Sequence, residues 1–330
     1  MNLSSGYLGL SLKSPLVVGA SPLTEKLDNI KIMEDSGAAA VVMHSLFEEQ
    51  IIAEQLSLHD STTAGTYSFA ESLTYFPEIE EYRLPADEYL TLIQKAKHSV
   101  GIPIIASLNG DTVGGWCNYA KKMEEAGADA VELNIYSVPS MVDITAEAIE
   151  NSYLEIVTAV KSNINIPIAV KLAPFFSNPA NMAKKLSDAG VNGLVLFNRF
   201  YQPDIDLDTL EVHPHINFSS SSANKLAMRW IAILKDKINC DFAATGGIHT
   251  SGDVIKMILS GANIAMLCSE LIKHGIGRIN AIEKEMIEWM DGKGYESVNQ
   301  MLGSMSQKKT PDPSRYERSQ YVKTISGYKV

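Results

Sequence analysis

One short pattern recurs four times along this chain and limits its fold more than any other feature. In each copy a helical stretch ends at a glycine, a small residue follows, and an apolar run comes next. The copies are DSGAAAVVMHS (35–45), EAGADAVELNI (125–135), DAGVNGLVLFN (188–198) and LSGANIAMLCS (259–269). Glycine suits the left-handed position that closes a helix, and a run apolar on both faces suits a strand covered by helices. The pattern therefore predicts alternating helices and parallel strands.

Four further segments bring the number of expected strands to eight. They are SPLVVGAS (14–21), GIPIIASLNG (101–110), NIPIAVKLAP (165–174) and CDFAATGGI (240–248). The eight strands are expected to centre near residues 17, 42, 105, 132, 170, 195, 243 and 266. Strict alternation of strand and helix gives a parallel sheet with right-handed crossovers. Eight such units predict an α/β fold of the (β/α)8 or TIM-barrel type, with a doubly wound open sheet as the alternative.

Two segments fall outside the repeat. Residues 47–90 form an insertion after the second strand, rich in Ser, Thr, Tyr and acids, and are expected over the barrel mouth as a lid or an oligomer contact. Residues 306–330 are polar and locally basic. They are expected to form a tail or a strap over a partner subunit, with a solvated extension as the alternative. The predicted organisation is one barrel domain over residues 1–305, followed by this extension.

Composition excludes several classes of function. The formal net charge is −11, which gives no basic surface for a nucleic-acid backbone. Cys117, Cys240 and Cys268 lie far apart in the sequence, which argues against a disulfide framework, a zinc site or an iron–sulfur cluster. No signal peptide is expected, and no apolar run approaches the roughly 20 residues of a membrane span. We therefore expect a soluble cytoplasmic protein with no metal and no nucleic-acid or membrane partner.

Polar side chains, with a few small residues among them, stand where the predicted strands end, which is where barrels of this kind carry their chemistry. In chain order they are Ala20, Ser21, His44, Ser45, Asn109, Asn134, Ser137, Lys171, Asn198, Gly246, Gly247, Cys268 and Ser269. Burying polar groups costs free energy unless something there uses them. The ring of strand ends therefore predicts a binding or catalytic site at one mouth of the barrel.

The glycine pair after the seventh strand predicts a phosphate site. Gly246 and Gly247 follow that strand and Ser269 follows the eighth, and the loops at these two places most often hold phosphate in such barrels. Glycine lets backbone N–H groups approach the oxygens, and a helix N-terminus adds favourable charge. Thr250 or Ser251 is the expected N-cap of that helix. The alternative is a tight strand–helix turn without a ligand.

Lys171 is a lysine set among apolar neighbours at a strand end, in IAVKLAP. Three interpretations stay open. Its stem could pack while its ammonium reaches an ion pair; it could hold an electron-rich cofactor ring; or it could form a Schiff base as an amine nucleophile. The second predicts a flavoprotein and the third a lyase. Asn134 can donate and accept toward a heterocycle, and Ser137 is either a residue of a closing loop or a turn serine.

At these residues the sequence resembles the dihydroorotate dehydrogenase family, and specifically its soluble class of FMN-containing (β/α)8 barrels. The resemblance covers roughly residues 7–303. The matching segments, in order, are YLGLSLKSPLVVGAS, VELNIYSVPS, IPIAVKLAPFF, GLVLFN, ATGGIHTSGDVIKMILSGANIAMLCSELIKHG and DGKGYESVNQMLG. It implies an FMN oxidoreductase that converts dihydroorotate to orotate in pyrimidine biosynthesis, and a homodimer.

The resemblance also implies roles for single residues. It implies FMN contacts for Ala20, Ser21, His44, Ser45, Asn134, Lys171, Asn198, Gly246, Gly247, Cys268 and Ser269. It implies substrate contacts for Ser72, Asn109, Asn134, Ser140 and Asn198. Ser137 stands at the position of the family's catalytic base, and Lys171 at that of the lysine beside the pyrimidine end of the flavin. A serine is a weak base, so a water relay or a concerted transfer is required with it.

The sequence departs from the family at its substrate loops. His44 replaces a lysine, Ser72 stands where an asparagine is expected, and Pro139 or Ser140 replaces a second asparagine. Each lost hydrogen bond is worth about 0.5–1.5 kcal/mol net. Four hypotheses follow: a dihydroorotate oxidoreductase, the same flavin scaffold with another small substrate, a Schiff-base lyase, and a flavin subunit of an electron-transfer complex. Electrons would leave to a soluble acceptor or to a partner subunit.

Overall fold

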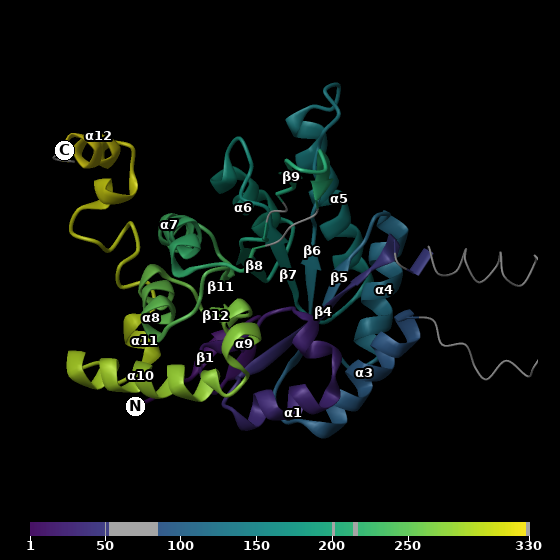
Figure 1. The fold of residues 1–330 in the computed structure, drawn as a ribbon, viewed down its shortest axis with the longest axis horizontal. Coiled ribbons are helices and arrows are strands. Elements are labelled where there is room, and N and C mark those ends of the chain that lie inside the picture. Colours follow the sequence, from purple (N-terminus) through teal and green to yellow (C-terminus); the bar gives the residue numbers. More distant parts are fainter. Residues whose placement is uncertain (50, 53–84, 200–201, 214–216, 328–330) are drawn as a thin grey trace, which may run out of the picture.

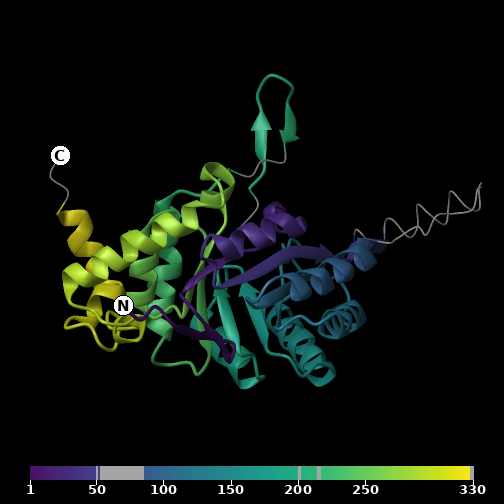
Figure 2. The same cartoon turned by 90° about the horizontal axis from the view of Figure 1, so that it is seen from below.

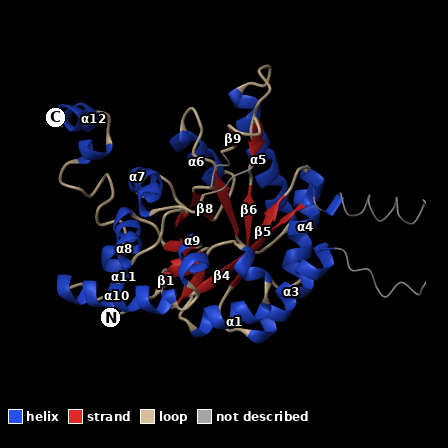
Figure 3. Cartoon of the chain, viewed as in Figure 1, coloured by secondary structure: helices blue, strands red, loops and turns tan. Residues whose placement is uncertain are grey.

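The computed structural model describes residues 1–49, 51–52, 85–199, 202–213 and 217–327, and a closed barrel of eight parallel strands forms its centre (Figure 1 and Figure 3). The strands are β3 (Leu16–Val18), β4 (Ala40–Phe47), β5 (Ile104–Asn109), β6 (Ala130–Asn134), β7 (Ile168–Leu172), β8 (Gly193–Leu196), β11 (Asp241–Thr245) and β12 (Ile264–Leu267). Each strand pairs with the next, and β12 pairs with β3, with Ala265 opposite Leu16, to close the ring. The predicted (β/α)8 barrel is confirmed, and the open sheet is not formed.

Helices return the chain along the outside of the ring. They are α1 (Leu27–Asp35), α3 (Pro85–Ser99), α4 (Val113–Glu125), α5 (Ala146–Asn163), α6 (Pro179–Asp188), α7 (Asn224–Leu234), α8 (Ser251–Ser260), α9 (Ser269–His274), α10 (Arg278–Lys293) and α11 (Val298–Met301). The four glycines of the repeat, Gly37, Gly127, Gly190 and Gly261, have φ of 105°, 95°, 92° and 123°. Such values favour glycine, so the repeat does mark the helix ends.

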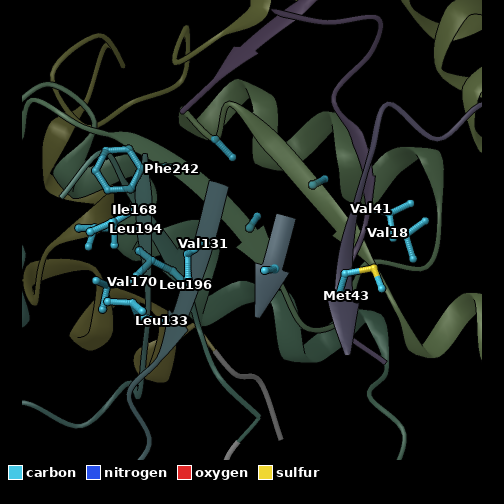
Figure 4. Packing of buried hydrophobic residues seen from close by; sticks show 14 of the residues in the cluster. Val18, Val41, Met43, Val131, Leu133, Ile168, Val170, Leu194, Leu196 and Phe242 are labelled. Carbon is cyan, nitrogen blue, oxygen red and sulfur yellow. The ribbon is translucent and has the colours of Figure 1, made fainter. Parts of the chain in front are cut away.

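Alternation along the strands divides the core into an outer and an inner layer. The outward residues pack beneath the helices, and Figure 4 shows Val18, Val41, Met43, Val131, Leu133, Ile168, Val170, Leu194, Leu196 and Phe242 among them. The inward residues form a second cluster of mostly small side chains, which includes Ala40, Val42, Ala130, Ala169, Val195 and Ala243. Since successive side chains of a strand point to opposite faces, Glu132, Asn134 and Lys171 share the inward face.

An N-terminal hairpin fills the amino end of the barrel. Strands β1 (Ser5–Tyr7) and β2 (Leu10–Leu12) pair antiparallel. Tyr7 and Leu8 are buried in the inner cluster. The backbone N–H of Leu8 donates to Asp241 Oδ2 over 2.8 Å, at the first residue of β11. The hairpin therefore closes the end opposite the predicted site.

The predicted insertion and a short hairpin lie outside the strand–helix repeat of the barrel. In the predicted insertion 47–90, Phe47 belongs to β4 and Pro85 begins α3, while residues 53–84 lie outside the described part, so the lid stays a prediction. A hairpin that the sequence did not indicate, β9 (Asp204–Asp206) and β10 (Glu211–His213), stands apart from the ring (Figure 2). None of the described helices is long and apolar enough to cross a membrane.

The C-terminal extension packs on the barrel helices at its start. Ser306 and Thr310 are buried, and the backbone carbonyl of Tyr316, in the 3-10 helix η3 (Pro313–Tyr316), accepts a hydrogen bond from Arg229 Nε of α7 over 3.1 Å. The last helix, α12 (Ser319–Ser326), has no buried residue. A strap over a partner subunit stays a prediction for this segment.

Candidate active site

An ion pair inside the barrel is the centre of the candidate site. Lys171 of β7 lies in register with Asn134 of β6, and its Nζ is 3.3 Å from Glu132 Oε1. The Lys171 side chain is 12% exposed and that of Glu132 is 1% exposed. A buried carboxylate is costly unless it is paired, so the pair fixes a cation near the carboxyl end of the strands. Sequence reasoning missed Glu132, although a carboxylate at an inward position of an apolar strand was a usable signal.

Two asparagine amides meet beside this pair. Asn198, which follows β8, donates from Nδ2 to Asn134 Oδ1 over 2.6 Å. The Asn134 side chain is buried, and Asn198 is half-buried. An amide has two donor hydrogens and an oxygen with two lone pairs. The two residues therefore keep capacity to bind a ring that carries both donors and acceptors.

Cys268, directly after β12, and Ala20, two residues after β3, join the same cluster. The Cys268 thiol donates to the Ala20 carbonyl oxygen over 3.8 Å. Burial raises the pKa of this thiol, and the nearby Lys171 charge acts against that rise. Ser21 is also buried, and a hydrogen bond with its side chain is a further cause that lowers the Cys268 pKa. Ala20, Ser21 and Cys268 therefore lie together near Lys171.

A β-bulge decides which residue at the end of β4 faces the inside. Val42 lies opposite Ile105, whereas Ser45 lies opposite Ser107, so β4 carries one extra residue between these pairs. Ser45 Oγ is 2.8 Å from Ser107 Oγ, and both share the inner face. Ser45 therefore takes the inward position that regular alternation would have given to His44.

The bulge turns His44 toward α3. Its ring packs edge-on to Tyr89, with 4.8 Å between ring centroids, and burial lowers its pKa. It lines a cavity of about 500 Å³ together with Glu25, Glu88, Tyr89, Thr91, Leu92 and Lys95. None of the other predicted site residues that the structure describes lines this cavity. A contact between His44 and the cofactor stays a prediction.

The remaining predicted substrate residues lie at the edge of the cluster or outside it. Asn109, at the end of β5, is buried, while Ser137 and Ser140 are exposed in the loop after β6. Burial raises the pKa of Tyr153, and a hydrogen bond with Ser137 opposes the rise. This places Ser137 beside the phenol of α5. Ser72 lies outside the described residues.

The two glycines after β11 have different surroundings. Gly246 and Gly247 have φ of 81° and 77°. A Cβ on Gly247 would lie 2.7 Å from both Asn224 N and Ser220 O, so glycine is needed there for close packing of the backbone. A Cβ on Gly246 would meet nothing within 4 Å. Gly246 therefore borders open space at the predicted phosphate site.

Polar groups from two loops and from the start of α9 form a hydrogen-bonded network beside this turn. The backbone N–H of Gly247 donates to Ser219 Oγ over 3.2 Å, and Ser219 Oγ donates to Ser269 Oγ over 3.2 Å. His249 Nε2 lies 3.2 Å from Ser219 Oγ, and its Nδ1 lies 3.0 Å from Glu270 Oε2. Sequence reasoning found Gly247 and Ser269 but missed the other three. Backbone N–H and hydroxyl donors gathered in this way suit an anion at a helix N-terminus.

The helix after the glycines begins as predicted. Thr250 is the N-cap of α8 and forms a capping box with Asp253. Asp253 Oδ2 also accepts from Ser221 Oγ over 2.8 Å and from the backbone N–H of His249 over 3.1 Å, and Oδ1 accepts from Asn224 Nδ2 over 2.8 Å. Burial opposes ionisation of this carboxyl, but these bonds hold its pKa below the usual value. Asp253 therefore ties the predicted phosphate loop to the segment before α7.

We expect Asp253→Asn to destabilise the protein by about 2–3 kcal/mol at pH 7, because charge-assisted hydrogen bonds are lost and a donor is placed among donors. A lowered carboxyl pKa confers stability that is full above the unfolded value of about 3.9 and is lost as the pH falls through the folded value. The difference between the two proteins should therefore shrink below about pH 4. Urea denaturation at pH 7 and pH 3 measures it. The exposed Asp28→Asn is the control, and equal effects of both substitutions would contradict the prediction.

Comparisons with known proteins identify relatives of this chain. A model of the dihydroorotate dehydrogenase family matches residues 85–290. The catalytic subunit of dihydroorotate dehydrogenase B (NAD(+)) from Thermoplasma acidophilum is 26% identical over 307 residues, 92% of this chain and 98% of the relative. The corresponding subunit from Methanothermobacter thermautotrophicus is 23% identical over 308 residues, 91% and 97% of the two chains. Dihydroorotate dehydrogenase A (fumarate) from Lactobacillus helveticus is 27% identical over 224 residues, 64% and 71%.

Proposed function

Because this chain belongs to the dihydroorotate dehydrogenase family, we propose that it is an FMN-dependent oxidoreductase that converts dihydroorotate to orotate, a reaction of pyrimidine biosynthesis. The observation that carries the proposal is the single cluster at the barrel mouth. There the Lys171 cation, the Asn134–Asn198 amide pair and the Gly246–Gly247 turn all stand at carboxyl ends of strands. This is the end where barrels of this kind carry their active sites.

The described residues fit FMN at both of its ends. The open space at Gly246, with the N–H of Gly247 and the Ser269 hydroxyl beside it, suits a phosphate at the start of a helix. Lys171 suits the pyrimidine end of the flavin, where negative charge develops on reduction. The buried Ser21 side chain, next to Ala20, offers a polar contact for the ring edge.

The mechanism follows from what these side chains can do. Asn134 and Asn198 would orient the substrate ring through their amides. Ser137 would take a proton from one ring carbon, through a water or in a concerted step, because an unassisted hydroxyl is a weak base. Bound FMN would supply the acceptor for the hydride that leaves the adjacent carbon. Lys171 would stabilise the negative charge that this transfer creates.

The other hypotheses differ in what they require of these residues. A Schiff-base lyase needs a free amine, but Lys171 is paired with a buried carboxylate. A different small substrate is the second candidate, favoured by the exposed loop in which Pro139 or Ser140 stands in place of an asparagine. The electrons would leave to a soluble acceptor or to a partner subunit. A cytoplasmic homodimer stays part of this proposal.

Anaerobic titration tests the proposal directly. Protein reconstituted with FMN should lose its flavin absorbance on addition of dihydroorotate, and Ser137→Ala should slow this bleaching by about 10²-fold or more, since general base catalysis contributes 10²–10⁴-fold. Bleaching by another dihydropyrimidine but not by dihydroorotate would favour the second candidate. A protein that binds no FMN would overturn the proposal. Borohydride trapping of a substrate on Lys171 would support the lyase instead.

A further inference from the structure

Glu132 is a buried carboxylate to which the proposed reaction gives no role. Its side chain is 1% exposed, and its Oε1 lies 3.3 Å from Lys171 Nζ. Its Oε2 is buried and has no hydrogen-bond partner among the described residues. A charge held away from solvent is poorly screened, so it acts strongly on neighbouring charges. Lys171 is its ion-pair partner among the described residues.

The charge of Glu132 also acts on groups on two sides of the barrel wall. Burial raises the pKa of Tyr7 well above its usual value, and Glu132 adds to the rise. Burial likewise raises the pKa of Tyr89, a hydrogen bond with Ser107 opposes the rise, and Glu132 adds to it. Tyr7 belongs to the hairpin that fills the amino end, and Tyr89 belongs to α3. The field of this one carboxylate therefore extends through the inside of the barrel.

We propose that Glu132 is a positioning residue that sets how much positive charge Lys171 presents to the flavin, and thereby sets the reduction potential of bound FMN. This inference rests on the proposed function. Reduction adds negative charge at the pyrimidine end of the flavin, and a cation there favours the reduced form. The negative charge of Glu132 offsets part of the positive charge of Lys171 from inside the barrel. It therefore lowers the potential and favours passage of the electrons to the acceptor.

The test is the midpoint potential of the FMN-loaded protein, measured by anaerobic titration against a redox dye at fixed pH. Glu132→Gln keeps the shape of the side chain and removes its charge. We expect the equilibrium constant for two-electron reduction to rise about tenfold, which is about 30 mV toward positive potential. Lys171→Gln should shift the potential in the opposite direction. A merely structural role for Glu132 would not move the potential in a folded protein.

Two further variants make the test decisive. Glu132→Ala also removes the charge, and it replaces Glu132→Gln if the amide is not tolerated. Asp241→Asn removes a carboxylate at the amino end of the barrel, and its potential should stay at the wild-type value. Wild-type or more negative potentials in the Glu132 variants would overturn the inference while the proposed function stands. Failure of the wild-type protein to hold FMN would overturn both.

Discussion

Replacing Lys171 with methionine is expected to destabilise the FMN-free protein by about 3–5 kcal/mol, because it leaves the Glu132 carboxylate buried without a counter-charge. The double variant Lys171→Met/Glu132→Gln removes both charges and should recover most of the loss, since a buried ion pair contributes little against neutral groups of similar volume. Equilibrium urea denaturation of the wild type, Lys171→Met, Glu132→Gln and the double variant measures the coupling between the two positions.

An exposed pair provides the matched control. Lys184 and Asp188 are neighbours on α6, 2.7 Å apart, with both side chains 63% exposed. Lys184→Met should change the free energy of unfolding by less than about 0.5 kcal/mol, because solvent screens such pairs. If Lys171→Met and Lys184→Met have similar effects, the ion pair inside the barrel is not the stabilising contact that we describe.

Gly247→Ala is expected to have the second large effect. Its Cβ would lie 2.7 Å from two backbone atoms, Asn224 N and Ser220 O, which cannot rotate away. Left-handed backbone costs a residue with a side chain about 1–2 kcal/mol, and overpacking adds about 1–3 kcal/mol. We therefore expect a loss of about 2–5 kcal/mol in unfolding free energy, measured by urea denaturation. A loss below about 1 kcal/mol would show that the 220–224 segment does not pack on the glycine.

Gly246→Ala distinguishes an effect on the stability of the fold from an effect on FMN binding. Its Cβ would meet no atom of the protein within 4 Å, so only the backbone strain of about 1–2 kcal/mol applies. The added methyl group would, however, enter the proposed phosphate space. Affinity for FMN should fall about tenfold or more, a loss of about 1.4 kcal/mol, while affinity for riboflavin, which lacks the phosphate, should be unchanged. Equal losses for both flavins would contradict a phosphate site at this turn.

Local sequence was enough to predict the barrel because short segments of sequence mark the end of each helix and the strand that follows it. Gly37, Gly127, Gly190 and Gly261 mark helix ends that need positive φ, and apolar runs after them mark strands buried on both faces. The β9–β10 hairpin was missed because residues 204–213 alternate acidic and apolar side chains without a glycine turn. Short exposed strands of this kind carry a weak signal.

The site residues at strand ends were predicted from their positions in the sequence. The contacts between residues of different elements were not predicted. Strand-end residues such as Lys171 and Asn198 follow from the order of the strands. Glu132 meets Lys171 only because β6 pairs with β7. His44 loses the inward position through a β-bulge, and no residue type in β4 indicates that bulge. The link from Ser219 through His249 to Glu270 joins two loops and helix α9, which are distant in the chain. Such pairings follow from tertiary structure alone.

The ring closes between the first barrel strand and the last. Beyond the β12–β3 pairing, Asn2 N donates to Glu296 O over 2.9 Å, and Val298 N donates to Asn2 O over 3.0 Å. A growing polypeptide can therefore complete its barrel only after almost all of these residues have left the ribosome. Until then the strands at both open edges display unpaired backbone groups, which are templates for aggregation. The yield of this protein in a cell should accordingly depend on how well chaperones shield the nascent chain until synthesis ends.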